Sequence, residues 1–310
     1  MIYIIMCTFN GERYIKEQLQ SIVDNIMEDW KLFISDDQSA DCTMKIAGEF
    51  QEKHPDKIFI YYNSSKKGAI GNFLNKIYET GLLMAEDDYI MLCDQDDIWN
   101  PDKIEKTMKG MKELIKTHGN NRPLLVCTDV CVADDDMNVI NESFRRMNHY
   151  SIKNLDFPHL MMENKVQGCT VMINRSLALM LKKMPKRATM HDGWLGLIAA
   201  AFGKVKYIDE PTMKYRQHDN NVQGSVAYKD DVKNKFSNLK EQRQIVMNTT
   251  GQIAEFIDIY AELLSPEVRR QAEAFATLPQ QNFFVRRYNI FKYHMWKSGA
   301  LRNIGLLLLI

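Results

Sequence analysis

The sequence lacks both an excess of charge and a long apolar run. Forty basic residues balance forty acidic ones among 310, so no overall attraction to nucleic acid is expected. The apolar N-terminal stretch MIYIIMCTFN has no basic leader and is too short for a signal peptide or a span. The sequence therefore gives no indication of secretion, nucleic-acid binding or a polytopic membrane protein.

The sequence also lacks the paired cysteine spacing of a zinc site. Its six cysteines are scattered, several of them inside apolar runs typical of buried strands: Cys7, Cys42, Cys93, Cys127, Cys131 and Cys169. Buried, reduced thiols are the simplest interpretation, and they indicate the reducing cytoplasm. With 45% hydrophobic residues, the chain is long enough for one large α/β domain and a smaller appendage.

Short β-branched runs alternate with helical patterns over the first two hundred residues. Strands are predicted at residues 2–6, 30–35, 58–62, 89–93 and 124–128, and helices at 10–27, 43–50, 71–84 and from about Pro101. This pattern predicts a doubly wound α/β sheet, in which ligands bind where the strands end. The acidic run 134–136 is predicted to be the solvated tip of a hairpin, a cation site being the alternative.

From about residue 234 the pattern becomes helical. We therefore predict a ligand-binding α/β domain over residues 1–225 and a helical region over residues 226–310. No acidic residue follows Glu273, while cations alternate with aromatic residues: Arg286, Arg287, Lys292, Lys297 and Arg302. This tail suits an anionic membrane surface, although packing on the catalytic domain or on a second subunit, as in a homodimer, is the alternative.

Acidic residues follow two of the predicted buried strands. Asp94-Gln95-Asp96-Asp97 comes after the strand 89–93, and Mg²⁺ or Mn²⁺ commonly joins such carboxylates to substrate phosphates. One carboxylate of an Asp-x-Asp motif can reach a ribose hydroxyl while the other holds the metal. Asp36 and Asp37 follow the strand 30–35, where a carboxylate can accept the imide N–H of a pyrimidine or cap the next helix.

Three ordered motifs together resemble a known family. Cys7-Thr8-Phe9-Asn10-Gly11-Glu12-Arg13-Tyr14, Ser35-Asp36-Asp37-Gln38-Ser39 and Asp94-Gln95-Asp96-Asp97-Ile98-Trp99 are similar to motifs of the family-2 inverting glycosyltransferases. The resemblance extends to about residue 222 and is closest to the bacterial rhamnosyltransferases of cell-wall and surface polysaccharide synthesis. It implies the GT-A fold, a Rossmann-like mixed sheet, here with a C-terminal helical extension.

The resemblance also implies a donor site and a metal site. The residues expected to bind the nucleotide sugar are Thr8, Asn10, Glu12, Asp36, Asp37, Lys66, Asp94, Gln95 and Arg216. Asp36 or Asp37 would read the base, Asp94 would lie near the ribose, and Lys66 or Lys67 would lie near the diphosphate. Asp96 and His218 would hold Mn²⁺ or Mg²⁺, with His218 as neutral imidazole.

The acceptor side is expected around His191-Asp192-Gly193-Trp194. A sugar hydroxyl is a poor nucleophile, so transfer needs a base, and the resemblance assigns that role to Asp192. An ordinary helix N-cap is the alternative for this carboxylate. Gln167, Gly168 and Trp194 would contact the acceptor, although Gly168 also suits a simple bend.

The expected activity is an inverting, metal-assisted single displacement. The first choice of donor is dTDP-L-rhamnose, with another UDP- or dTDP-sugar (glucose, galactose, GlcNAc) as the alternative. The acceptor would be a lipid-linked or growing glycan at the cytoplasmic face of the inner membrane. A sugar nucleotidyltransferase is disfavoured because no glycine-rich signature with a basic residue follows the first strand. A glycan-binding scaffold without turnover is the non-enzymatic alternative.

Overall fold

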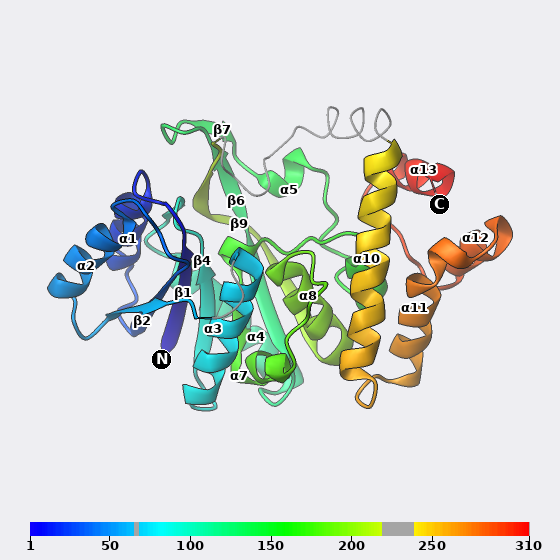
Figure 1. Cartoon of the computed structure of the whole chain (residues 1–310), viewed down its shortest axis with the longest axis horizontal. Coiled ribbons are helices and arrows are strands. Elements are labelled where there is room, and N and C mark those ends of the chain that lie inside the picture. The colour runs from blue at the N-terminus through cyan, green and yellow to red at the C-terminus, as the bar shows by residue number, and fades with distance from the viewer. Residues whose placement is uncertain (65–67, 219–238, 310) are drawn as a thin grey trace.

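The computed structural model describes residues 1–64, 68–218 and 239–309, which form a mixed sheet flanked by helices (Figure 1). The strands are β1 Ile2–Thr8, β2 Trp30–Asp36, β3 Ile58–Tyr62, β4 Tyr89–Cys93, β5 Ile98–Trp99, β6 Leu124–Ala133, β7 Val139–Asn141, β8 Met172–Asn174 and β9 Lys204–Arg216. The helices of the sheet region are α1 Ile15–Val23, α2 Thr43–Lys53, α3 Ala69–Leu83, α4 Lys103–His118, α5 Phe144–Met147, α6 Phe157–Met162, α7 Arg175–Ala178 and α8 His191–Phe202. After them come α10 Leu239–Tyr260, α11 Pro266–Ala276, α12 Phe283–Lys292 and α13 Ala300–Leu309, and the 3-10 turns are η1 Gly168–Thr170, η2 Leu179–Lys182 and η3 Leu278–Gln280.

The sheet is mixed in strand direction. The order of its strands is β3-β2-β1-β4-β8-β6-β9-β5, and β7 lies outside this order and pairs with β6. Strands β3, β2, β1 and β4 are parallel, whereas the short β8 runs antiparallel to both β4 and β6. The expected mixed α/β sheet is therefore confirmed.

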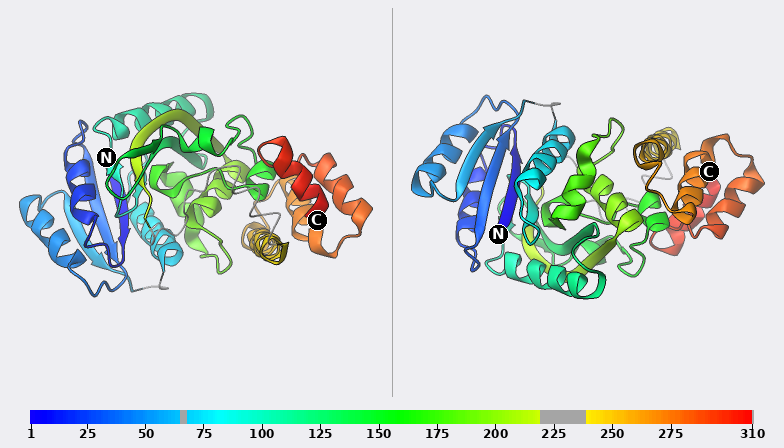
Figure 2. Two further views of the ribbon diagram at one scale, coloured as in Figure 1. Left: turned by 90° about the horizontal axis from the view of Figure 1, so that it is seen from above. Right: turned by 90° about the horizontal axis from the view of Figure 1, so that it is seen from below.

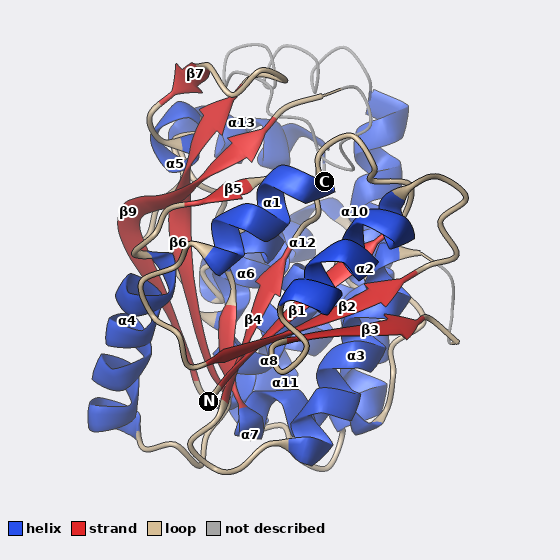
Figure 3. Ribbon diagram, turned by 90° about the vertical axis from the view of Figure 1, so that its left-hand side faces the viewer, coloured by secondary structure: helices blue, strands red, loops and turns tan. Residues whose placement is uncertain are grey.

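Alternating side chains of each strand supply two separate hydrophobic cores. In β1, Ile2, Ile4 and Met6 face the core that contains α1, α2 and α4, while Ile5 faces the core that contains α3, α7 and α8. Figure 3 views the sheet with α1 and α2 on its near face. Both faces of the sheet are thus covered, so its polar sites are confined to the strand ends.

The C-terminal helices gather at one end of the molecule, away from α1 and α2 (Figure 2). Helix α10 packs on α8 through Ile253, Phe256 and Tyr260, which share the core of Trp194. The predicted boundary between residues 225 and 226 lies outside the described residues. Among the residues that are described, the helices are too short or too polar to cross a bilayer.

Some local predictions differ from the structure. The helix expected to start near Pro101 begins at Lys103, and the strand predicted at 124–128 continues to Ala133 as β6. The hairpin is present, but its tip is not simply solvated, because Asp135 binds the side chains of Arg13 and Tyr14. The tip therefore closes against the N-terminus of α1.

Candidate active site

The carboxyl ends of three parallel strands bring the sequence motifs to one edge of the sheet. The register pairs Thr8 of β1 with Asp36 of β2, and Met6 of β1 with Cys93 of β4. The segment that begins at Asp94 therefore emerges beside Thr8. In a parallel sheet this edge is the usual place for a nucleotide site.

Asp36 is a structural residue of this edge. Its carboxylate is fully buried and accepts hydrogen bonds from Thr8 Oγ1 (2.8 Å) and from Ser39 through both the backbone N (2.8 Å) and Oγ (2.6 Å). Asp37 is only half-buried, and its two oxygens accept from Asn63 Nδ2 and the Gly68 backbone N. Of the two carboxylates proposed to read the base, Asp37 is thus the one that faces outward.

The loop after β1 is held in place by polar side chains. Asn10 adopts a left-handed conformation (φ 47°), and its Oδ1 accepts a hydrogen bond from the backbone N of Ala40. Glu12 accepts from the backbone N of Cys42 (2.7 Å). Both contacts fasten this loop to the loop that follows β2. Asn10 and Glu12 therefore shape the rim of the site.

Gln95 joins the Asp-x-Asp segment to the same loop. Its Nε2 donates to the carbonyl of Phe9 and its Oε1 accepts from the Phe9 N–H, both at 3.0 Å. A Cβ on Gly11 would overlap Gln95 Oε1, so a side chain there would push the Gln95 amide away from Phe9. Phe9, which was not expected in the site, is 57% exposed. An exposed aromatic ring beside a nucleotide site can stack on a base.

The acidic cluster after β4 has perturbed electrostatics. Burial raises the pKa of Asp94 to about 7, and the nearby charges of Asp96 and Asp192 act in the same direction. The Asp97 carboxylate is fully buried and accepts from the backbone N of Arg216 (3.1 Å). Its other oxygen has no hydrogen-bond partner in the described part of the chain. An unneutralised acidic cluster of this kind favours a bound cation.

The donor atoms around this cluster suit a hard divalent cation. His218 Nε2 lies 2.9 Å from Asp96 Oδ2, and its ring stacks on Tyr14 at a centroid distance of 4.8 Å. Carboxyl oxygens of Asp94 and Asp97 lie within 4.8 Å of each other and of Cys169 Sγ. Burial raises the pKa of the Cys169 thiol well above its usual range, and its soft sulfur is not a ligand that Mg²⁺ or Mn²⁺ prefers. The carboxylates and imidazole thus fit Mg²⁺ or Mn²⁺.

Arg216 has a different position from the one predicted. Its side chain is 4% exposed, and its Nε donates to the carbonyl of Asp96 (2.8 Å) while its other nitrogens bind Glu17 and the Asp135 carbonyl. The guanidinium also lies 4.7 Å from the centre of the Tyr14 ring. These contacts occupy the group that was expected to bind the diphosphate. Arg216 instead fixes the Asp-x-Asp segment.

Asp192 lies in the first turn of α8 and is held by three donors. Asn164 Nδ2 and the Gly193 N–H both bind Oδ1, the former at 2.9 Å, and the Gly168 N–H binds Oδ2 at 2.9 Å. Burial raises the pKa of this carboxyl above its ordinary value, against the lowering effect of His191 and of these hydrogen bonds. A raised pKa makes the carboxylate a better proton acceptor near neutral pH.

The turn η1 connects Asp192 to the acidic cluster. Gly168 binds Asp192 through its backbone N, and the next residue, Cys169, lies against Asp94 and Asp97. A Cβ on Gly168 would lie 2.7 Å from His191 Nε2 and 3.4 Å from Asp192 Oδ2, so only glycine fits. Acids that are about a hundred residues apart in the chain therefore meet in one region.

Trp194, Gln167 and two lysines were also predicted to lie in the site. Trp194 is fully buried and packs edge-on against Phe256 (5.3 Å between ring centres), so the prediction that it contacts the acceptor is wrong. Gln167 is half-buried in the turn before Gly168. Lys66 and Lys67 lie outside the described residues. Asn164 was missed because only the fold brings it to Asp192.

Comparison with known sequences identifies relatives over most of the chain. The sequence profile of glycosyl transferase family 2 matches residues 3–161. The dTDP-rhamnosyl transferase RfbG of Shigella flexneri is 33% identical over 229 residues, which is 71% of this chain and 74% of that protein. The putative teichuronic acid biosynthesis glycosyltransferase TuaG of Bacillus subtilis is 26% identical over 225 residues, 72% of this chain and 81% of that protein.

Solved structures share the fold at low sequence identity. S. aureus TarS in complex with UDP-GlcNAc superposes with a TM-score of 0.53 at 15% identity, covering 94% of this chain and 89% of that one. The mannosyltransferase PcManGT of Pyrobaculum calidifontis, in complex with GDP-Man and Mn²⁺, has a TM-score of 0.53 at 14% identity, covering 99% and 78%. The fold is thus of the GT-A type, and the chain belongs to glycosyl transferase family 2.

Proposed function

We propose that this chain is an inverting glycosyltransferase that uses Asp192 as its general base. The observation that carries the proposal is the convergence at η1, where Gly168 binds the Asp192 carboxylate and Cys169 lies beside Asp94 and Asp97. In this proposal the nucleotide-diphosphate donor and the acceptor hydroxyl share one site. A base on one side and a cation site on the other are what a single displacement requires.

The proposed reaction breaks one bond and forms one. Asp192 takes the proton of the acceptor hydroxyl as its oxygen attacks the anomeric carbon of the donor sugar. The bond from that carbon to the diphosphate breaks, the nucleoside diphosphate leaves from the opposite face, and the configuration inverts. A divalent cation bound by Asp96 and His218 would supply positive charge to the leaving diphosphate.

The remaining predicted residues have donor-side roles in this proposal. We infer that Asp37 and the exposed Phe9 contact the base and that Asp94 contacts the ribose, which is supported by the exposure of Phe9. The rim residues Asn10 and Glu12 and the bridging Gln95 keep the loops in register. Lys66 stays a proposed diphosphate contact.

The proposed donor is dTDP-L-rhamnose. This choice rests on the similarity to RfbG at 33% identity, with UDP- or dTDP-linked glucose, galactose or GlcNAc as alternatives. The decisive assay offers each nucleotide sugar with Mn²⁺ or Mg²⁺, with and without EDTA, and measures the nucleoside diphosphate released. We expect release from dTDP-rhamnose that EDTA abolishes. Pyrophosphate release from a nucleoside triphosphate and a sugar phosphate, with no turnover of any nucleotide sugar, would contradict the proposal.

The proposed acceptor is a lipid-linked or growing glycan at the cytoplasmic face of the membrane. Helices α12 and α13 lie side by side, since Arg287 of α12 binds the carbonyl of Leu307. Together they expose apolar side chains that we call the membrane face: Phe283, Phe284, Val285, Tyr288, Phe291, Leu301, Ile304 and Leu308. Exposed aromatic residues beside cations suit an anionic lipid surface.

The cations of this region differ in how far they are exposed. Arg302 is buried and pairs with Glu163 at 3.2 Å, so it fastens α13 to the catalytic region instead of binding headgroups. Lys292 is exposed at the end of α12, and no acidic residue follows Glu273 in the sequence. Peripheral attachment through the membrane face would bring the enzyme to a lipid-linked acceptor.

A further inference from the structure

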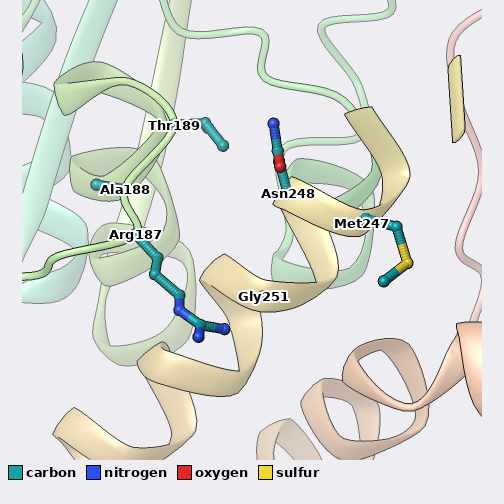
Figure 4. Close-up of a pocket in the computed structure, with 6 residues that line it drawn as sticks. All are labelled: Arg187, Ala188, Thr189, Met247, Asn248 and Gly251. Carbon is teal, nitrogen blue, oxygen red and sulfur yellow. The ribbon is translucent and has the colours of Figure 1, made fainter. Parts of the chain in front are cut away.

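A pocket lies between the loop that leads into α8 and the facing side of α10. It has a volume of about 330 Å³, and the described residues that line it include Arg187, Thr189, Asn248 and Gly251. Figure 4 shows Arg187 and Thr189 on the loop side and Asn248 and Gly251 on the helix side. We propose that this pocket binds an anionic group of the acceptor glycan, a phosphate or a carboxylate, and the proposal rests on the glycosyltransferase function above.

Hydrogen bonds to α10 hold the loop and leave the side chain of Arg187 available. Glu255 accepts hydrogen bonds from the backbone nitrogens of Lys186 and Arg187, at 2.9 and 2.7 Å. Gln252 accepts from both the backbone N and the hydroxyl of Thr189. Glu255 and Gln252 are therefore used by the loop backbone and the Thr189 hydroxyl. Among the described residues, no carboxylate lies within ion-pair distance of the Arg187 guanidinium.

The polar groups in the pocket are mainly donors. Gln244 donates to Asn248 Oδ1 (2.9 Å), which leaves the amide N–H₂ of Asn248 to the pocket. A Cβ on Gly251 would lie 3.3 Å from Arg187 Nη1, so the glycine gives the guanidinium room against the helix. None of the six described lining residues is acidic. One cation with neutral donors and no acid favours an anion, and a guanidinium binds phosphate or carboxylate through two parallel hydrogen bonds.

The position of the pocket connects it to the acceptor. Arg187 precedes Asp192 by five residues, so their Cα atoms are at most about 18 Å apart, which is roughly three to four sugar rings. An acceptor glycan of about that length with its hydroxyl at Asp192 can therefore place a charged group beside Arg187. Helix α10 also leads towards the C-terminal helices that carry the membrane face (Figure 1).

Binding is tested directly with inorganic phosphate and with acetate. Each ion is titrated into ¹⁵N-labelled full-length protein while the Asn248 side-chain amide and the Gly251 backbone amide are followed by NMR. We expect at least one of the two ions to shift both signals, and the more effective ion indicates a phosphate or a carboxylate. Arg187→Gln should weaken this binding about ten- to a hundredfold, as expected for loss of a charged hydrogen bond. Lys183→Gln, an exposed change in the same loop outside the pocket, is the matched control and should bind as the wild type does.

Absence of a shift with both ions, or equal affinity of Arg187→Gln and wild type, would overturn the proposal. In the transfer reaction, Arg187→Gln should raise the acceptor KM at least tenfold with little change in kcat. The release of nucleoside diphosphate by the wild-type enzyme is measured separately. If that release is absent while the ion still binds, the proposed function has failed and not the pocket.

Discussion

Removal of the Asn164 amide tests how the general base is tuned. Asn164 Nδ2 donates to Asp192 Oδ1 at 2.9 Å, and this hydrogen bond lowers the pKa of the carboxyl against the raising effect of burial. Asn164→Ala removes a donor that stabilises only the ionised form. The pKa of Asp192 should therefore rise further, so that a smaller fraction of the enzyme holds the active carboxylate at low pH.

The size of this effect follows from the exposure of the donor. A hydrogen bond to a charged group contributes about 1.5–3 kcal/mol, and the solvent-exposed position of Asn164 favours the lower end of that range. About 1.4 kcal/mol corresponds to one pH unit. The acid limb of the kcat profile should thus move up by about one pH unit, with up to a tenfold loss of rate below it and full recovery at alkaline pH.

The assay is nucleoside diphosphate release during transfer, measured across the pH range. Asn154→Ala is the matched control, because Asn154 is an exposed asparagine on a nearby loop whose side chain makes no contact with Asp192. Its profile should follow that of the wild type. An unchanged pH profile for Asn164→Ala, or an equal loss of rate at every pH, would refute the role of Asn164 in lowering the pKa of Asp192.

Three further predictions concern the cation, the core and the membrane face. His218→Ala should raise the Mn²⁺ concentration needed for half-maximal turnover at least tenfold, and an unchanged requirement would exclude His218 from the site. Trp194→Ala should destabilise the fold by about 3–5 kcal/mol in denaturant unfolding, because a fully buried indole is lost; a small loss would contradict its core position. Phe284→Glu with Phe291→Glu should abolish sedimentation with anionic vesicles, whereas Leu83→Glu, an exposed apolar residue of α3, should not. If the double variant still sediments with the vesicles, the assignment of the membrane face is wrong. If the two substitutions only convert a dimer into monomers, the face is a contact between subunits.

The parallel half of the sheet was predictable from the sequence because its signals are local. The strands Ile58–Tyr62 and Tyr89–Cys93 have the predicted bounds, since each is an apolar run ended by polar residues. The strand Lys204–Arg216 was not predicted. It contains Pro211, its register with β6 shifts, and its pairing joins segments some eighty residues apart, which no local pattern encodes.

The candidate site was predictable where its residues follow strands. Asp94 and Asp96 lie at a strand end, and their position was apparent from the sequence. The contacts of Arg216 and Trp194 depend on what packs around them: Glu17 and Asp96 occupy the guanidinium, and Phe256 covers the indole. A residue type and a motif do not specify such partners, so these contacts could not be predicted from the sequence.

The most direct test of Asp192 as the general base is to measure both the transfer rate and the donor affinity of the variant Asp192→Asn. The amide keeps the size of the carboxylate but cannot take a proton from the acceptor. If Asp192 is the general base, the variant should bind the donor within about twofold of the wild type and lose at least a hundredfold in transfer. Transfer at the wild-type rate would contradict a base at this position, and with it the single-displacement site.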